Sequence, residues 1–453
     1  MATAASRATD MGMRAPSRTL WSRITTVLIF MPVFLFRYTF ILFSGPFGYG
    51  SYIGYYTLLP FFASRYRFPW KMALLFIPIL LTGWINVTQG NGSQDTFLKV
   101  ALAFFTIALF YWYAWQYFKQ DVRRVTRIYI RGAYLVSAIG LVLWADLTFL
   151  NGSVTEFLRN FVSISITREG SSVRLNSTLG EPNFFANVVA PAALLSLNRL
   201  LFSGDSWGLS RRKHVIILLA FVLCLSGMVF AGLAIAMVLL LINRGFFRHL
   251  ILGAVPLFFL LRFVLLSTPE FKDRFDGMTS LISGEKMEIG VTHGSSIVLF
   301  MHSRIAWMNF SERPFFGTGL GSHEVATQRY VSAVIGEEWN PYRSQNAKDA
   351  NSMFLRLLSE TGMYGAGIML WLLFFRYVPR HRSSTDYHWL ISSAFAVAIL
   401  LNLIRQGNYI LNGFPFFLWG YYIVWSDNRR LLMERRETIA QENIARKKLE
   451  RTL

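Results

Sequence analysis

The chain has little charge, few acidic residues and a single cysteine. Only 15% of its 453 residues are charged, against about 25% in an average soluble domain, which excludes one large soluble enzyme. The lone cysteine, Cys224, cannot pair within the chain, so a disulfide scaffold is excluded. Hydrophobic residues make up 53% and aromatic residues 16%, a composition that excludes a disordered chain or a collagen-like repeat.

What the sequence contains instead is a series of long apolar runs. A helix rises 1.5 Å per residue and therefore needs about 20 apolar residues to cross a hydrocarbon core about 30 Å thick. The continuous run 215–243 is divided at Ser226-Gly227, because a single helix there would reverse every later loop. The sequence predicts an all-α integral membrane protein with about twelve transmembrane helices, at 24–44, 47–63, 72–87, 97–118, 128–150, 183–203, 215–228, 229–243, 249–267, 357–375, 388–404 and 409–426.

The basic residues lie mainly on one side of the predicted membrane. Lys and Arg number 45, and Asp and Glu 25, which gives a net charge of +20. With a cytoplasmic N-terminus, the cytoplasmic segments carry +19, the external segments −2 and the spans +3, as the positive-inside rule requires. Both termini are therefore predicted to be cytoplasmic. The excess charge marks topology and attracts anionic lipid headgroups, and it is not evidence for a nucleic-acid partner.

This topology divides the chain into five parts. The hydrophobic run after the first basic residues is too long for a signal-peptide core, so we interpret it as the first span. The charged C-terminal tail is expected to form a surface helix. The parts are a cytoplasmic N-terminal segment at 1–23, nine spans in 24–267 with an external segment at 151–182, a large external loop at 268–350, three spans in 351–426, and a basic cytoplasmic tail at 427–453.

Arginines gather at or near the external face. Guanidinium groups stay charged at any relevant pH and make bidentate contacts with phosphate oxygens, so ionisable residues here are candidates for binding a diphosphate. The alternative roles are snorkelling to lipid headgroups and pairing with local carboxylates. Glu360, for example, lies four residues after Arg356 and would share one helix face with it. The candidates are Arg174, Arg262, Arg304, Arg356 and Arg405.

Three stretches in the second half carry recognisable patterns. Residues 174–187 read RLNSTLGEPNFFAN, in which Pro182 suits the first position of a helix and Glu181 lies where a helix N-terminus favours negative charge. Residues 304–323 read RIAWMNFSERPFFGTGLGSH, whose glycines permit a tight turn and close backbone approach to a ligand. Residues 349–367 read DANSMFLRLLSETGMYGAG, an amphipathic turn that leads into the tenth span.

In this order, the three stretches resemble the bacterial O-antigen ligase and O-antigen or exopolysaccharide polymerase superfamily. Its members commonly show an arginine and D/E-P-N-x-x-A, then R-x-x-x-W with P-x-x-G-x-G-x-G, then H-N-x-x-L-x-x-L-x-E-x-G-x-x-G. The resemblance covers roughly 170–370. The corresponding residues are Arg174 with Glu181-Pro182-Asn183, Arg304-x-x-Trp307 (one residue shorter than the family spacing) with Pro314, Gly317, Gly319 and Gly321, and Asn351 with Leu355, Leu358, Glu360, Gly362 and Gly365.

The resemblance implies a metal-independent glycosyltransferase with a GT-C-like fold in the bacterial inner membrane. Such enzymes move a glycan from an undecaprenyl-diphosphate carrier onto an acceptor hydroxyl at the periplasmic face. Expelling the diphosphate requires positive charge, which the arginines supply. The chain has no Asp-x-Asp pair and its seven histidines are dispersed, so neither a metal nor another cofactor is expected.

Two departures from the family pattern bear on the reaction. The late-loop histidine is Asn351 here, which orients a hydroxyl but takes no proton, and a serine-arginine pair of the middle spans is Ser226-Gly227. Both departures shift weight from ligase to polymerase. The candidate bases are Glu181, Asp349 and His323, with a preference for the two carboxylates.

We therefore expect a polymerase that joins lipid-linked oligosaccharide repeat units outside the cytoplasm. Its partners would be the undecaprenyl-diphosphate-linked donor and acceptor, membrane lipids and a chain-length regulator. A ligase that transfers the finished glycan to another acceptor is the alternative within the superfamily. A lipid-linked glycan carrier or flippase is the alternative from another class, although the 83-residue loop at 268–350 is unusual for a carrier.

Overall fold

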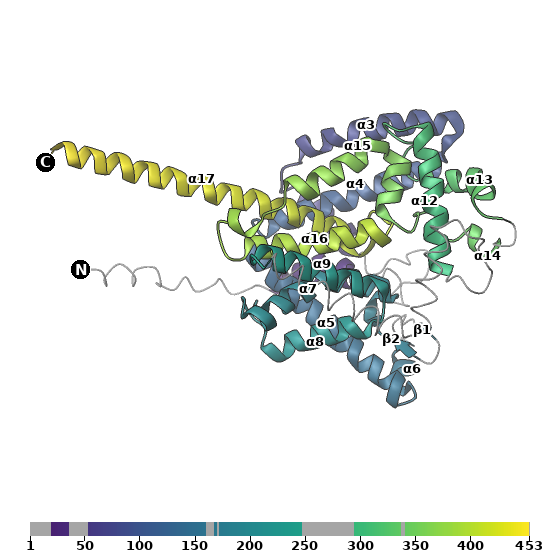
Figure 1. The fold of residues 1–453 in the computed structure, drawn as a ribbon, viewed down its shortest axis with the longest axis horizontal. Helices are drawn as coiled ribbons and strands as arrows, with labels where there is room; N and C mark the ends of the chain where they lie inside the picture. Colours follow the sequence, from purple (N-terminus) through teal and green to yellow (C-terminus); the bar gives the residue numbers. More distant parts are fainter. Residues whose placement is uncertain are drawn as a thin grey trace.

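The computed structural model describes residues 20–35, 53–159, 167–169, 172–246, 294–336 and 340–452. The predicted span at 249–267 lies outside these residues, as do parts of those at 24–44 and 47–63. The described chain is almost entirely helical (Figure 1). Its long helices are α1 (Leu20–Phe34), α2 (Ile53–Ala63), α3 (Trp70–Asn86), α4 (Gln94–Tyr117), α5 (Val122–Phe149), α7 (Pro182–Phe202), α8 (Arg211–Leu223), α9 (Gly227–Asn243), α12 (Gly294–Glu312), α13 (His323–Val334), α15 (Met353–Phe375), α16 (His388–Arg405) and α17 (Phe414–Thr452).

The apolar runs form helices that suit a membrane. In the part of the chain that the structure describes, six are long and apolar enough to cross one. They are α4, α5, α7, α15, α16 and the stretch Ala73–Asn91, which joins α3 to the π-helical turn η3 (Val87–Asn91). Among the described helices, α1, α2 and α9 are shorter but equally apolar. This is the architecture of an all-α, multi-pass membrane protein. The described residues also contain one short β-structure, an antiparallel hairpin of β1 (Thr167–Glu169) and β2 (Ser172–Arg174).

The continuous apolar run 215–243 is two helices. Helix α8 ends at Leu223, Leu225 takes a left-handed φ of 47°, and α9 begins at Gly227. Ser226 caps α9, because its Oγ accepts a hydrogen bond from the Met228 amide at 3.2 Å. The serine thus satisfies an amide that a helix start would otherwise leave unpaired. The break predicted at Ser226-Gly227 is present.

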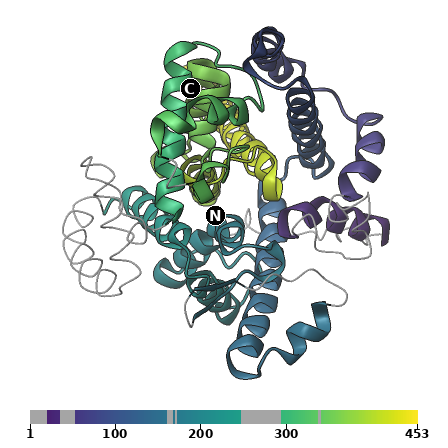
Figure 2. The same cartoon turned by 90° about the vertical axis from the view of Figure 1, so that its right-hand side faces the viewer.

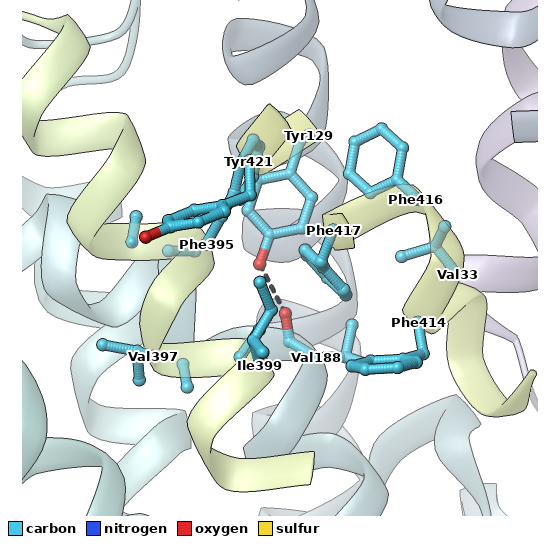
Figure 3. Close-up of a cluster of buried hydrophobic side chains, with 14 of the residues drawn as sticks. Val33, Tyr129, Val188, Phe395, Val397, Ile399, Phe414, Phe416, Phe417 and Tyr421 are labelled. Atoms are coloured by element: carbon cyan, nitrogen blue, oxygen red, sulfur yellow. Dashed lines mark hydrogen bonds between the residues drawn. The ribbon is translucent and has the colours of Figure 1, made fainter. Parts of the chain in front are cut away.

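Helices α7 and α16 form the centre of the bundle. They are the most buried of the six candidate spans, and α7 packs against α5, α8, α9 and α16. An aromatic cluster fills the space between α5, α16 and the start of α17 (Figure 3). Within it the buried Tyr129 hydroxyl donates to the Val188 carbonyl, and Phe417 packs edge-on against Tyr129 and Phe395. The cluster ties α5 to α7 by a hydrogen bond and to α16 and α17 by apolar packing.

Helix α15 is broken at Gly362, and a turn from another part of the chain repairs the break. Gly362 has φ 59° and ψ −154°, which interrupts the helical hydrogen bonds. The turn 314–319 supplies replacement hydrogen bonds. The amides of residues 318 and 319 donate to the carbonyls of residues 359 and 360, at 3.3 and 2.8 Å respectively. On the other side of the break, the amides of residues 363 and 364 donate to the carbonyls of residues 314 and 315, at 2.8 and 3.0 Å. Irregular backbone at membrane depth is tolerated only when protein satisfies it in this way.

The described part of the predicted loop 268–350 consists of helices joined by turns. Helices α12 and α13 pack through a small apolar core of their own, and α14 (Asn340–Arg343) follows. Figure 1 shows α12–α14 and the β-hairpin at one end of the bundle, whereas α17 projects from the other end. Figure 2, which looks along most of the helices, shows the yellow helix α17 between the green helices of the second half of the chain and the blue and purple N-terminal helices.

The predicted tail helix is continuous with the last span. After the short turn η8 (Leu411–Gly413), α17 runs for 39 residues without interruption. Its first part packs against α4 and α16, and most of its residues after Asn428 are exposed. The sequence indicated both pieces as helical but did not indicate that they form one helix.

Candidate active site

A polar cavity of about 910 Å³ lies where the ends of five elements meet. The start of α7 and the end of α16 form its floor, the described parts of α12 and α13 form one wall, and the segment 342–351 forms the other. Its charged lining residues are Glu181, Glu324, Arg343, Lys348, Asp349 and Arg405. Concave sites of this size with a few convergent charged groups are typical of small-molecule binding.

Glu181 stands at the entrance of α7. It is the N-cap residue of the helix and Pro182 occupies the first helical position, as the sequence indicated. Its side chain, however, makes no capping hydrogen bond and lines the cavity instead. Removal from bulk water raises the pKa of Glu181, and the negative charge of Asp349 raises it further. A carboxylate with a raised pKa accepts a proton more readily than an unperturbed one, as a general base must.

Asp349 and Asn351 are presented by a segment with unusual backbone geometry. Asn346, Ala350 and Asn351 all have left-handed φ values of 54–56°. The Asp349 Oδ1 accepts a hydrogen bond from the Asn351 amide at 3.0 Å, which holds the turn closed. Left-handed backbone in a non-glycine residue is strained, and such strain concentrates at functional sites. Both residues line the cavity, together with Glu181.

Three cations share the cavity with these carboxylates. Arg405 is the last residue of α16, and Arg343 and Lys348 belong to the facing segment. The Lys348 ammonium is 3.9 Å from a Glu324 carboxylate oxygen, a loose contact in which the lysine side chain stays 80% exposed. The sequence analysis identified Arg405 but missed Arg343 and Lys348. Arg343 and Lys348 precede Asp349 by six residues and one residue, and this proximity was the signal that could have identified them.

Arg356 forms a buried ion pair away from the cavity. Its Nε donates to Glu360 Oε1 at 2.9 Å, its Nη1 donates to the Gly407 carbonyl at 3.0 Å, and its guanidinium lies 4.3 Å from the centroid of the Tyr409 ring. The Tyr409 hydroxyl donates to the other Glu360 oxygen at 3.0 Å. Arg356 is 5% exposed and does not line the cavity. The pairing with Glu360 that the sequence left open is the one observed.

The other candidate arginines are dispersed. Arg174 ends β2 half-buried, and its Nε donates to the Cys224 carbonyl at 3.4 Å. Arg304 lies exposed on α12, 5.4 Å from the centroid of the Phe300 ring. Neither residue lines the cavity. Arg262 lies outside the described residues. Of the four candidate arginines that the structure describes, only Arg405 lies beside the candidate carboxylates.

His323 is buried in a chain of hydrogen bonds behind the cavity wall. Its Nε2 lies 3.0 Å from His302 Nδ1, and its Nδ1 lies 3.0 Å from Ser359 Oγ. His302 Nε2 lies 2.7 Å from the Gln345 carbonyl. Because a carbonyl only accepts, His302 carries its proton on Nε2, and each following group donates toward it.

Burial lowers the pKa of both histidines. Burial, and then the charges of His302 and Arg356, hold the pKa of His323 well below its usual value. Burial also lowers the pKa of His302. Both side chains are fully buried, and neither lines the cavity. His323 therefore supports the segment that carries Gln345 and does not reach a ligand in the cavity.

The glycine-rich turn approaches the chain's own backbone instead of a ligand. Gly317 has φ 64°, and a Cβ there would lie 2.5 Å from the Thr361 nitrogen. The turn docks at the break in α15, and none of its glycines lines the cavity. Within the described ranges there is also no group of three His, Cys, Asp or Glu side chains that would hold a metal ion.

A comparison with known proteins matches the middle part of the chain, which contains some of these features. A family model described as O-antigen ligase matches residues 214–370. The match begins within α8, covers α9 and the described helices α12–α14, and ends within α15. It therefore includes Asp349, Asn351 and the glycine-rich turn, whereas Glu181 and Arg405 lie outside it. No curated protein matches the chain. The match, which covers about a third of the chain, supports the superfamily of O-antigen ligases and polymerases that the sequence motifs resemble.

Proposed function

We propose that the chain is a membrane glycosyltransferase that polymerises undecaprenyl-diphosphate-linked oligosaccharide repeat units at the periplasmic face of the inner membrane. The observation that carries the proposal is the cavity at the ends of α7 and α16, where two interacting carboxylates lie beside three cations. The family match supports glycan transfer as the class of reaction. The predicted topology, with its basic segments in the cytoplasm, supports the periplasmic location of the cavity.

In this proposal, a hydroxyl of the acceptor glycan attacks the anomeric carbon of the donor sugar. The new glycosidic bond forms as the bond between that carbon and the diphosphate oxygen breaks, and the diphosphate leaves on its polyprenyl carrier. Glu181 or Asp349 takes the hydroxyl proton, and the Asn351 amide orients the hydroxyl. Arg405, with Arg343 and Lys348, stabilises the negative charge of the departing diphosphate.

We assign Glu181 as the base in preference to Asp349. Its pKa is raised from the ordinary value of a carboxyl, so it binds the transferred proton more tightly than an unperturbed carboxylate does. The Asp349 carboxylate, which accepts the Asn351 amide, is engaged in holding its turn. The negative charge of Asp349 contributes to the reaction indirectly, by raising the pKa of Glu181. His323 has no role as a base in this proposal, because it is buried outside the cavity.

A ligase is the second candidate, because the matching family model is described as O-antigen ligase. The polymerase is preferred because Asn351 occupies the position of the histidine that ligases of this family use. A left-handed asparagine at this position supplies a hydrogen bond but no proton acceptor.

The glycan profile of a deletion strain separates the candidates. A polymerase mutant retains single repeat units, a ligase mutant accumulates long carrier-linked chains, and a flippase mutant traps units on the inner face. Complementation with Glu181→Gln or Arg405→Gln is expected to restore membrane protein but not chain growth. Glu156→Gln, at an exposed position on α6 (Ser153–Arg159), and Arg446→Gln, on the exposed part of α17, are the matched controls. Normal chain length in both site variants would overturn the site assignment.

A further inference from the structure

A second polar cavity lies at the opposite end of the bundle. It has a volume of about 640 Å³ and is lined at the end of α7 by Phe202 and at the start of α16 by Trp389. The candidate active site lies at the other ends of the same two helices, at Glu181 and Arg405. Because α7 has 21 residues, the two cavities are about 30 Å apart, which is the thickness of a hydrocarbon core.

Three arginines from different elements converge on this cavity. Arg123 comes from the first turn of α5, Arg244 caps the end of α9, and Arg380 begins the 3-10 turn η7 (Arg380–Arg382). Each comes from a different segment that the charge pattern predicts to be cytoplasmic. The positive-inside rule requires these charges on one side of the membrane, but it does not require them around one cavity.

The arginines are held in place by aromatic rings and by polar contacts. The guanidinium carbon of Arg244 lies 4.7 Å from the centroid of the Phe202 ring and 5.6 Å from that of Trp389. Its Nη2 donates to Asn198 Oδ1 at 2.7 Å, whereas its Nε is buried without a hydrogen-bond partner. Arg380 lies 5.8 Å from the Trp389 centroid. Aromatic rings that pack against guanidinium groups in this way orient them without neutralising their charge.

The charges around the cavity are only partly balanced. Arg123 pairs with Asp205 at 2.7 Å, but among the ion pairs of the described residues none involves Arg244 or Arg380. Burial, and then the nearby charge of Arg380, lower the pKa of Arg244, an effect that Asp386 only partly opposes. Two cations that repel each other across a cavity are stabilised by an anion placed between them.

We propose that this cavity binds a phosphate group, with Arg244 and Arg380 as its principal contacts. The location at the ends of membrane-crossing helices favours the headgroup of an anionic phospholipid, since basic pockets between such helices recognise these headgroups. A soluble phosphate would satisfy the same guanidinium groups. The site is separate from the candidate active site, and its test is independent of the proposed glycosyltransferase activity.

Native mass spectrometry of the purified full-length protein in detergent tests the proposal with three probes. These are phosphatidylglycerol, phosphatidylcholine and inorganic phosphate. We expect phosphatidylglycerol to bind more tightly than phosphatidylcholine, and Arg244→Gln and Arg380→Gln each to weaken that binding about fivefold. Arg446→Gln, which removes an equal charge from the exposed part of α17, is expected to leave it unchanged.

The outcomes separate the sources of the phosphate. If inorganic phosphate binds with the same dependence on Arg244 and Arg380 while phosphatidylglycerol does not, the site takes a soluble phosphate. If neither probe depends on these arginines more than on Arg446, the proposal is overturned. Should Arg244→Gln fail to fold, Arg380→Gln carries the test, because Arg380 is exposed on a short turn.

Discussion

The docking of the glycine-rich turn on the break in α15 predicts a large effect from one methyl group. We consider Gly317→Ala. A Cβ there would lie 2.5 Å from the Thr361 nitrogen and 2.6 Å from the Glu360 carbonyl oxygen, which are backbone atoms that cannot move aside like a flexible side chain. The φ of 64° also places alanine in the left-handed region, at about 1–2 kcal/mol.

The turn must therefore shift and lose hydrogen bonds. The nearest two are those from the amides of residues 318 and 319 to the carbonyls of 359 and 360. Each contributes about 1 kcal/mol, and more if the carbonyl is left buried without a partner. Together with the backbone strain, we expect Gly317→Ala to lower the free energy of unfolding by about 3–5 kcal/mol.

Gly367→Ala is the matched control, because it makes the same chemical change within α15. A Cβ at Gly367 meets no heavy atom within 4 Å, and the backbone there is helical. Alanine is expected to stabilise the helix by about 0.5–1 kcal/mol. Thermal and denaturant-induced unfolding of the purified protein in detergent compares the two variants. The reasoning is refuted if Gly317→Ala unfolds with the parent protein, or if Gly367→Ala is destabilised as strongly.

Three further predictions follow from buried or coupled charges. The pKa of His323 is depressed in the folded protein, so as the pH falls below about 6.5 the unfolded chain takes up a proton that the folded chain does not. The free energy of unfolding therefore falls by up to about 1.4 kcal/mol per pH unit, and His323→Gln should flatten this slope between pH 7.5 and 5. Equal slopes for the variant and the parent protein would contradict this expectation. Arg356→Gln strands the Glu360 carboxylate and should cost about 3–5 kcal/mol, whereas replacing both residues by Met should restore most of the loss in the same unfolding assay. Asp349→Asn removes the like charge that raises the pKa of Glu181, so the acid limb of the pH–rate profile should move to lower pH; complete loss of activity would instead make Asp349 the base.

The helices could be predicted from the sequence because hydropathy directly reflects a membrane environment. Within the described ranges, the apolar runs are helices, and the break at Ser226-Gly227 was predictable because one long helix would have reversed the distribution of basic loops. The Arg356–Glu360 pair was accessible for a similar reason, since residues four apart share one helix face. Local spacing sufficed in each case.

The partners of the motifs could not be predicted, because they lie far away along the chain. The spacing of Gly317 permits close backbone approach but does not say that the approach is to Thr361. His302 and His323 are 21 residues apart on different helices, so no periodicity pairs them. The composition of the cavity likewise depends on the end of α16 meeting the start of α7. Tertiary contact decided which charged residues face one another.

The length of α17 has a mechanical consequence. Its 39 residues make a rod about 58 Å long, roughly twice the thickness of a hydrocarbon core, and its distal part is reinforced by pairs such as Arg430–Glu434 and Arg446–Glu450. A flexible tether would let an attached body tumble freely. A continuous rod instead holds its far end at a set height above the bilayer, and any tilt of the segment packed against α4 and α16 swings that end through a proportionally larger arc.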